Sequence, residues 1–222
     1  MPLLLLASNS PRRRQLLALG GWEFAVDISN VDETLLPSET PAAYVRRLAI
    51  EKARAVMPRA GAQQVIIGAD TSVVIDDDVL GKPVDREDAR QMLVRLRGRT
   101  HQVYTGIAVL RAGDGRLWSD VVVTDVPMRP YGDEEIESYI HSGDPMDKAG
   151  AYGIQNPNFQ PVAISSMAGC YASVMGLPLC SLVVLLRQAG FTPPADEARN
   201  CQDTINYRCP VFASIRRGES QK

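Results

Sequence analysis

The first twenty residues constrain the fold more than any other stretch of the chain. Residues 3–6 are four consecutive leucines, a run of strand length, and a segment with helical spacing extends from Pro11 to Gly20-Gly21 after a short polar loop. Ser10 can accept hydrogen bonds from the free amides of the first helical turn, and Pro11 suits the first helical position because it has no N–H to satisfy. The pattern predicts strand, loop and helix.

Three consecutive arginines, Arg12, Arg13 and Arg14, fall in the first turn of this predicted helix. Cations are disfavoured there because the helix macrodipole is positive at its N-terminus, and a bound anion would compensate. Free amides, hydroxyl groups and forked guanidinium donors are the groups that hold a phosphate chain. We therefore expect Arg12 and Arg13 to bind a phosphate-bearing ligand and Arg14 to be solvated.

Length and charge narrow the class of protein. With 222 residues the chain exceeds a typical domain but falls short of two, so we expect one α/β domain with an extra lobe. The formal net charge of -2 argues against duplex nucleic acid as a partner, because proteins that bind it usually carry a basic patch. No apolar run approaches the roughly 20 residues that span a bilayer, and the leucine run lacks the flanks of a signal peptide. We expect a cytoplasmic protein with no nucleic-acid or membrane partner.

The cysteines and histidines predict no disulfide framework and no His-rich metal centre. The cysteines lack C-x-x-C spacing and are few for this length, and two histidines are too few for a centre built on imidazoles. These residues are Cys170, Cys180, Cys201, Cys209, His101 and His141. Cys201 and Cys209 could bind metal or pair under oxidation, but we expect ordinary reduced thiols.

A lysine interrupts the apolar stripe of the second predicted helix. Thr40 can cap a helix that begins at Pro41 and ends near Val56, and Lys52 falls in the middle of its apolar face. A lysine in that position either extends its ammonium group past the core or is held against an anion. Both readings stay open from the sequence.

Asp70 is the most informative carboxylate. It stands between two apolar strand-like segments, residues 65–67 and 73–75, whereas Asp76-Asp77-Asp78 occupy a turn where aspartate is expected. Burial without a partner would raise the pKa of Asp70, which suits a base, and a bound cation would keep it ionised as a ligand. Neighbouring backbone amides could instead satisfy it. The following Gly81-Lys82-Pro83 loop suits close approach to phosphate.

Further elements follow from capping and periodicity. We expect helices that begin after Asp85 and Asp133, a third over residues 178–190, two long strands over 103–110 and 118–126 joined at Asp114-Gly115, and a strand over Val162 to Ser166. The glycine-rich segment around Lys148 suggests a backbone that passes close to a ligand.

From Phe191 the chain is polar with little periodicity. We therefore divide it into a domain of residues 1–190 and a loosely attached, partly disordered extension of residues 191–222.

Seven motifs taken together resemble the Maf family of nucleoside triphosphate pyrophosphatases, in order and spacing from Leu3 to about Gly190. The motifs are Ser8-x-Ser10-x-Arg12-Arg13, Asp32-Glu33, Glu51-Lys52-Ala53, Ala69-Asp70-Thr71, Gly81-Lys82-Pro83, Gly98-Arg99-Thr100-His101-x-Val103-x-Thr105-Gly106 and Asp147-Lys148-Ala149-Gly150-Ala151-Tyr152-Gly153-Ile154-Gln155. The last motif and the paired arginines look like the branch that acts on dTTP and UTP. After Gln155 the chain departs from the family pattern, with Asn156-Pro157-Asn158-Phe159 in place of small residues and an acid-containing strand.

The resemblance implies an α/β fold with an elongated mixed sheet flanked by helices, as in Maf and ITPase proteins, and two lobes with a nucleotide in the central cleft. It implies a divalent metal, Mg²⁺ or Mn²⁺, and attack of water on the α-phosphorus to give the monophosphate and pyrophosphate. Asp70 would be the catalytic acid, as base or as metal ligand with Glu33. Substrate choice would rest on Arg12, Thr71 and Gln155, and the phosphate and metal neighbourhood on Ser8, Arg13, Glu33, Lys52 and Lys82.

Two alternative functions stay open at this point. The protein could hydrolyse 7-methyl-GTP or another modified nucleotide by the same chemistry. It could instead be a nucleotide-binding regulator of cell division or septum formation, a role with which Maf proteins are also associated. A homodimer is possible.

Overall fold

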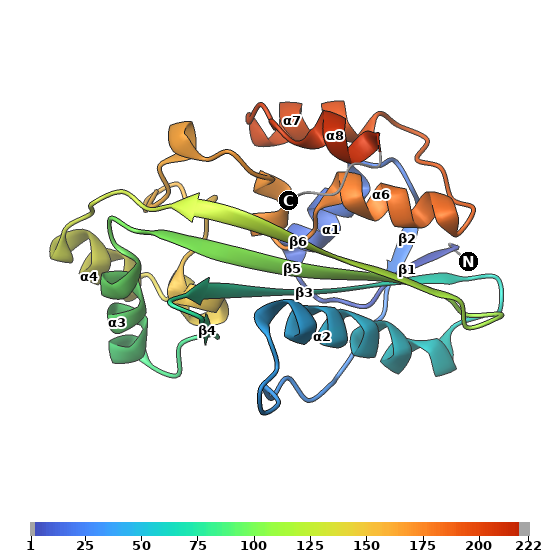
Figure 1. The fold of residues 1–222 in the computed structure, drawn as a ribbon, viewed down its shortest axis with the longest axis horizontal. Coiled ribbons are helices and arrows are strands. Elements are labelled where there is room, and N and C mark those ends of the chain that lie inside the picture. The colour runs from blue at the N-terminus through green and yellow to red at the C-terminus, as the bar shows by residue number, and fades with distance from the viewer. Residues whose placement is uncertain (1–2, 218–222) are drawn as a thin grey trace.

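The computed structural model describes residues 3–217 and has a long mixed sheet at its centre (Figure 1). The strand order is β2-β1-β3-β5-β6, with β4 on the outer edge of one end of β3. The β1 strand runs parallel to β2 and β3, and the other pairs are antiparallel. The strands are β1 (Leu4–Leu6), β2 (Phe24–Val26), β3 (Val65–Ile75), β4 (Asp78–Leu80), β5 (Thr100–Arg111) and β6 (Leu117–Pro127). The predicted mixed α/β fold, with helices flanking an elongated sheet, is confirmed.

Helices lie on both faces and at one end of this sheet (Figure 1). The second helix packs on one face against β3 and β5, whereas α5 and α6 pack on the opposite face against β5 and β6. The third and fourth helices pack together at the far end of the long strands, and α7 and α8 cover the outer side of α6. The helices are α1 (Pro11–Ala18), α2 (Pro41–Val56), α3 (Arg86–Leu96), α4 (Asp133–His141), α5 (Tyr171–Val174), α6 (Leu179–Gln188), α7 (Glu197–Ile205) and α8 (Phe212–Arg216).

Side-chain caps begin the first three helices where the sequence predicts them. Ser10, Thr40 and Asp85 each accept a hydrogen bond from the amide three residues later. The fourth helix differs from the prediction, because Gly132 and not Asp133 is its N-cap. Its free amide is satisfied by the Glu135 carboxylate at 3.0 Å. Asp133 instead forms an ion pair with Arg97 at 2.7 Å.

Two glycines let the backbone of α2 lie directly on the sheet. A Cβ atom at Gly68 of β3 would sit 2.0 Å from the carbonyl oxygen of Ala49, and one at Gly106 of β5 would sit 2.2 Å from that of Val45. Backbone atoms cannot yield to such contacts as a flexible side chain can. Any side chain at these two positions would therefore lift α2, and with it Lys52, away from the sheet.

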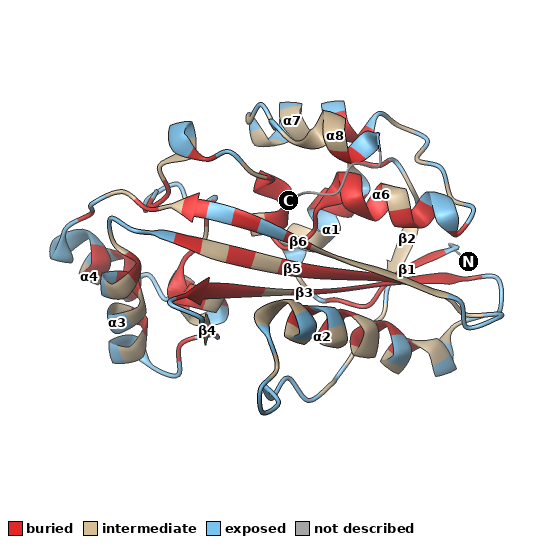
Figure 2. Cartoon of the chain, viewed as in Figure 1, coloured by how far each residue is buried: buried red, intermediate tan, exposed pale blue. Residues whose placement is uncertain are grey.

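Alternation along the strands creates two apolar cores, one on each face of the sheet, visible as red segments in Figure 2. The smaller core lies under α2 and includes Ile66 and Ala53, both fully buried. The larger core joins the opposite face to the loops and helices packed on it, and includes Ile67 and Leu182. The sheet is therefore covered on both sides over its central part, and polar groups that reach it need partners within the protein.

The edge of β3 is left open over five residues. The β1 strand pairs with residues 65–67 and β4 pairs with residues 73–75, so the stretch between them, residues 68–72, pairs in the sheet with β5 alone. The loop that follows β1 runs alongside this opening, since the amide of Ala7 still bonds to the carbonyl of Ile67 at 2.8 Å. A gap in the edge of an otherwise covered sheet gives a ligand access to side chains from both faces of the strand.

Two predicted strands differ from the structure. Residues 65–75 form one continuous strand and not two segments interrupted by Asp70, because Asp70 keeps extended geometry and pairs with Gly106. Residues 162–166 are not a strand. A single bridge joins Val162 to Met128, and residues 164–166 form a 3-10 turn, because the preceding Asn156 side chain ties the chain into a compact loop.

Residues 197–216 form two helices packed on α6, and do not form the loose segment that their composition suggests (Figure 1). Ala198 and Ile215 are buried against Cys180 of α6. The carboxylate of Glu197 is buried and lies 3.5 Å from the Arg216 guanidinium. The division of the chain at residue 190 stays a prediction, and residues 218–222 of the predicted extension lie outside the described residues. Among the described residues, no helix combines the length and apolar character that crossing a membrane requires.

A buried histidine on β5 predicts a loss of stability in acid. The His101 ring is 2% exposed, its Nε2 lies 2.8 Å from the Tyr152 hydroxyl, and burial lowers its pKa from 6.5 to about 4. Because the unfolded chain takes up a proton at higher pH than the folded chain, stability is complete above about pH 6.5 and falls between pH 6.5 and 4. We expect this single group to cost about 3 kcal/mol across that window.

Urea unfolding at several pH values measures this contribution. The His101→Gln variant should lose most of the slope between pH 6.5 and 4, whatever its stability at neutral pH. His141→Gln, at an exposed position on α4, is the matched control and should keep the slope of the unaltered protein. An unchanged slope in His101→Gln would show that the acid sensitivity comes from other groups.

Candidate functional site

A cleft of about 550 Å³ opens along the unpaired edge of β3. This volume is within the range of small-molecule sites. Its walls come from the loop after β1, the start of α1, the middle of α2, β3, the β4 loop and two later segments, residues 147–154 and 174–176. The part of the chain that carries α2 and the part near α3 and α4 thus both contribute, as the predicted arrangement of two lobes with a central cleft requires.

Eight of the nine residues predicted for the site line this cleft, although they are spread over 75 residues of sequence. They are Ser8, Arg12, Arg13, Glu33, Lys52, Asp70, Thr71 and Lys82. Gln155 is the exception: it is exposed in a turn and is not among the lining residues, while Gly153 and Ile154 are. The Ile154 side chain is buried and its carbonyl is held by the Tyr171 hydroxyl at 3.1 Å, so the chain turns outward at Gln155. The structure thus gives the predicted substrate role of Gln155 no supporting contact.

Lys52 lies between two carboxylates at the centre of the cleft. Its ammonium nitrogen is 2.6 Å from Asp70 Oδ1 and 2.6 Å from Glu33 Oε1. The Lys52 and Asp70 side chains are 10% and 9% exposed, against 53% for Glu33. Of the two readings left open by the sequence, the structure therefore supports a lysine held against anions.

The local charges lower the pKa of Glu33. Partial burial acts to raise it, but the hydrogen bond and positive charge of Lys52 outweigh that effect, and the charges of Lys82 and Arg13 add to the lowering. A carboxylate that stays ionised beside an ammonium group is an oxygen donor suited to a hard cation.

Arg13 is fixed by three hydrogen bonds from its guanidinium group. Nε donates to the Gly176 carbonyl at 2.9 Å, and the two terminal nitrogens donate to Ser8 Oγ and Thr71 Oγ1, each at 3.2 Å. Burial lowers the pKa of Arg13, and the charge of Asp70 opposes this effect. A guanidinium has five N–H groups, so two remain available to a ligand in the cleft.

Arg12 and Lys82 provide positive charge without partners. Both line the cleft, and neither makes a hydrogen bond or ion pair to any residue between 3 and 217. Arg13 and Lys52, by contrast, are held in place by neighbouring groups. The cleft therefore combines two fixed cations with two that have free donors, an arrangement that suits several phosphate groups in a row.

Neighbouring residues of β3 reach the cleft from opposite faces of the sheet. Asp70 points toward α2, where it meets Lys52, and Thr71 points to the other face, where its hydroxyl lies 3.1 Å from that of Thr105. The Thr105 hydroxyl donates to the carbonyl of Ser173 at 2.9 Å. The open edge of β3 is what allows both side chains to line one cleft.

Sequence reasoning did not identify Tyr44 and Gly176. The Tyr44 hydroxyl donates to the Glu33 carbonyl at 2.7 Å, and burial together with the charges of Asp70 and Glu33 raises its pKa to about 12. Gly176 has φ +107°, and a Cβ atom there would lie 3.2 Å from Arg13 Nε. Tyr44 lies eight residues before Lys52 on α2, a spacing that could have suggested a shared face. No sequence signal ties Gly176 to Arg13.

Lys148 lines the cleft but is already neutralised. Its ammonium nitrogen lies 2.9 Å from an Asp144 carboxylate oxygen and 2.7 Å from one of Asp147. The sequence singled out this glycine-rich segment as one that passes close to a ligand, and residues 147–149 and 152–154 do line the cleft.

The donor set fits a hard divalent cation that also binds phosphate oxygens. Glu33 and Asp70 each contact the Lys52 ammonium through one carboxylate oxygen, so the second oxygen of each is the one a cation could take, and Mg²⁺ is usually held by one or two carboxylates together with phosphate oxygens and water. Among residues 3–217 no group of three or more His, Cys, Asp or Glu side chains is arranged to hold a metal alone. A cation here would therefore share its coordination with the substrate.

Comparison with known proteins identifies related sequences over most of the chain. A family described as Maf-like protein matches residues 3–189. A dTTP/UTP pyrophosphatase of Hahella chejuensis is 47% identical over 84% of this chain and 92% of its own. One of Symbiobacterium thermophilum is 47% identical over 86% of this chain and 96% of its own, and one of Vibrio cholerae is 45% identical over 83% and 97%.

A solved structure also aligns in part. It is described as a nucleoside-triphosphatase / dITP/XTP pyrophosphatase from Mycobacterium abscessus, with a TM-score of 0.37 and 13% identity over 56% of this chain and 73% of that chain.

Proposed function

The chain belongs to the Maf-like protein family, and from this membership we propose that it is a nucleoside triphosphate pyrophosphatase that hydrolyses dTTP and UTP to the monophosphate and pyrophosphate. The observation that carries the proposal is the cleft itself, in which Arg12, Arg13 and Lys82 stand around the Lys52–Asp70 pair. The relatives named dTTP/UTP pyrophosphatase are matched over 92 to 97% of their own length, so the comparison covers nearly their whole chains.

Binding of the triphosphate rests on the cations. Arg12 and Lys82 have free donors for the outer phosphates, and Arg13, which also lines the cleft, has two N–H groups beyond the three that are hydrogen-bonded. Because the guanidinium of Arg13 is already fixed, little side-chain entropy is lost when it binds. Ser8 and Thr71 fix that guanidinium through their hydroxyl groups.

Hydrolysis requires a water molecule, a base and stabilisation of the leaving group. Water attacks the α-phosphorus, the bond from that phosphorus to the bridging oxygen breaks, and pyrophosphate leaves with the added negative charge. Asp70 is the buried carboxylate placed to accept the proton of the water, and its contact with Lys52 at 2.6 Å fixes its orientation in the cleft. The cations that hold the phosphates also offset the charge that develops on the leaving oxygens.

Glu33 and Asp70 would hold the divalent cation, Mg²⁺ or Mn²⁺. When bound, such a cation polarises phosphate oxygens and lowers the pKa of a coordinated water molecule. Lys52 contacts both carboxylates at 2.6 Å and so holds Glu33 and Asp70 on the same side of the cleft. Chelation with EDTA followed by titration of each metal into the hydrolysis assay tests this part of the proposal.

Release of pyrophosphate from a panel of nucleoside triphosphates tests the reaction and its substrate together. We expect turnover of dTTP and UTP well above that of ATP, GTP and 7-methyl-GTP. Turnover of 7-methyl-GTP alone would show that the substrate is a modified nucleotide and not dTTP or UTP. Binding of triphosphates without turnover of any would support the regulatory alternative, in which the cleft is a sensor.

A further inference from the structure

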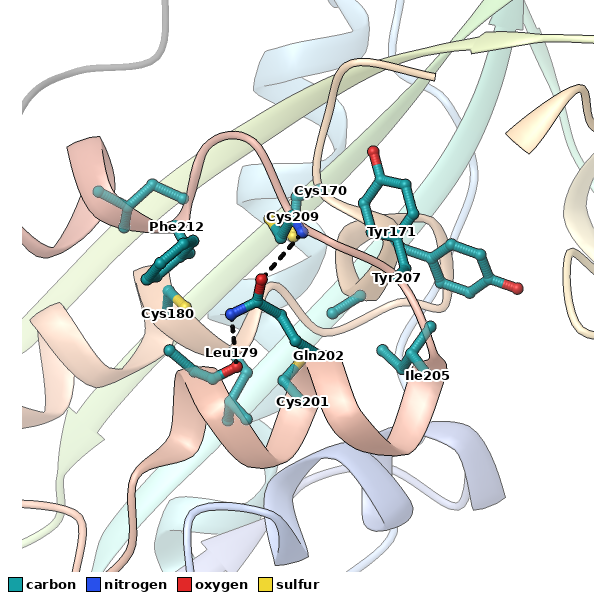
Figure 3. A pocket seen from close by; sticks show the side chains of 13 residues that line it. Cys170, Tyr171, Leu179, Cys180, Cys201, Gln202, Ile205, Tyr207, Cys209 and Phe212 are labelled. Carbon is teal, nitrogen blue, oxygen red and sulfur yellow. Dashed lines mark hydrogen bonds between the residues drawn. The ribbon is translucent and has the colours of Figure 1, made fainter. Parts of the chain in front are cut away.

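The four cysteines gather in one small cavity, although up to 39 positions separate them in sequence. Figure 3 shows this cavity between α5, α6 and the two C-terminal helices, on a different side of the molecule from β4 and the opening along β3. Apart from Gln202, the rest of its lining is apolar or aromatic, and includes Tyr171, Tyr207 and Phe212. No step of the proposed hydrolysis uses these thiols.

Cys170 and Cys209 are a pair within this group. Both line the cavity, and each acts on the pKa of the other: Cys209 raises the pKa of the Cys170 thiol, and Cys170 lowers that of the Cys209 thiol. The backbone holds both residues in place. Cys170 caps α5, its sulfur accepting from the Ser173 amide at 3.4 Å, and the Cys209 amide donates to Gln202 Oε1 at 3.1 Å. Both sulfurs therefore belong to one small cavity, and each residue is held there by its own hydrogen bond.

Cys209 is the more reactive of the two thiols. Interaction with Cys170, together with the backbone amides of Val211 and Phe212, lowers its pKa from 9.0 to about 7 despite partial burial. Burial raises the pKa of Cys180 and Cys201 to about 12. Cys209 is also partly exposed, whereas Cys170 is buried. At neutral pH a substantial fraction of Cys209 is therefore thiolate, which is the form that attacks a disulfide.

We propose that Cys170 and Cys209 are a redox modification site that forms a reversible internal disulfide by exchange with a small-molecule disulfide such as oxidised glutathione. The Cys209 thiolate attacks one sulfur, the S–S bond of the small molecule breaks, and one small thiolate leaves. Cys170 then gives up its proton to solvent and attacks the Cys209 sulfur, which releases the second small thiolate. Two protein thiols are oxidised and one small disulfide is reduced to two thiols.

The internal disulfide would fasten the C-terminal helices to the wall of the cleft. Cys170 lies six residues before Gly176, whose carbonyl holds Arg13, and Cys209 lies in the turn between α7 and α8. The bond closes a loop that contains α5, α6 and α7, and this restricts the unfolded chain. It is independent of the proposed hydrolase activity, because neither sulfur lines the cleft.

Oxidation of the full-length protein tests the proposal. Reduced protein is incubated with oxidised glutathione at pH 7.5, free thiols are alkylated, and peptides are analysed by mass spectrometry without reduction. We expect a peptide pair joined through Cys170 and Cys209. The loop of about 40 residues should raise the melting temperature by roughly 8 to 15 °C over that of the reduced protein, and dithiothreitol should reverse the shift.

Three serine variants locate the effect. Cys209→Ser and Cys170→Ser should each abolish both the cross-link and the shift, whereas Cys201→Ser, in the same cavity, should keep both. Circular dichroism of each reduced variant checks that it folds, and Cys209→Ser, at the partly exposed position, provides the test if Cys170→Ser does not fold. A cross-link that joins a different pair would overturn the proposal. So would glutathione retained on Cys209 without an internal bond, or an equal yield of the cross-link in guanidinium chloride.

Discussion

Replacement of Asp70 by asparagine is expected to lower kcat for dTTP about 10²- to 10⁴-fold, the usual range for loss of a general base, while the nucleotide still binds. Asparagine has nearly the same shape and keeps an oxygen that can accept from Lys52, so the fold and the cleft should survive the exchange. It cannot accept the proton of the attacking water. It also removes one of the two carboxylate donors proposed for the cation. Steady-state release of pyrophosphate gives kcat, and calorimetry with a non-hydrolysable dTTP analogue gives the affinity.

Asp77→Asn is the matched control for this experiment. Asp77 lies in the exposed β3–β4 turn with φ +64°, a conformation that asparagine tolerates, and it does not line the cleft. Its kcat should equal that of the unaltered protein. If the Asp70→Asn variant retains full turnover, Asp70 takes no part in the hydrolysis step, and its role is the structural one of holding Lys52.

Replacement of Arg13 by alanine is expected to weaken binding of the triphosphate analogue roughly 10- to 150-fold, with little effect on thymidine. The estimate assumes the loss of one charge-assisted hydrogen bond to a phosphate, worth about 1.5 to 3 kcal/mol. The same change frees Ser8, Thr71 and the Gly176 carbonyl, which Arg13 holds together. Calorimetry with the two ligands separates phosphate contacts from contacts to the nucleoside.

Two further variants define what Arg13 supplies. Arg13→Lys keeps the positive charge but loses the planar fork, so its binding should fall between that of the alanine variant and that of the unaltered protein. Arg14→Ala changes the neighbouring arginine, which is exposed and lies outside the cleft, and should bind both ligands normally. Equal weakening of triphosphate and thymidine in Arg13→Ala would show that this arginine is not at the phosphates.

The Arg13 and Lys52 predictions show how far local reasoning extends. Arginines at a helix start indicated a bound anion, and a lysine on an apolar stripe indicated either an anion or an ammonium group extended past the core, because each places a charge where the local structure disfavours it. The structure confirms a carboxylate partner for Lys52 and gives Arg13 hydroxyl and carbonyl partners. It also shows why these partners could not be derived from the sequence, since Gly176 lies 163 positions from Arg13.

Predictions failed where tertiary contacts replaced a local preference. The helices of residues 197–216 are short and pack against α6, a tertiary contact that the prediction of a loose segment did not foresee. Val162 to Ser166 has the β-branched content of a strand, but it has one bridge and no neighbouring strand along which to extend.

The sequence by itself determined the elements whose signals are local: the capped starts of α1, α2 and α3, the long β5–β6 hairpin, and the apolar faces that oblige α2 and α6 to pack on a sheet. These depend on backbone groups and side chains within a few residues of one another. The tertiary structure alone decided which charged side chains lie together. Their positions depend on where β1 and β4 end along β3, and on the close approach of α2 to the sheet that Gly68 and Gly106 allow. The cleft and the thiol pair both arise from such long-range packing, which no short window of sequence encodes.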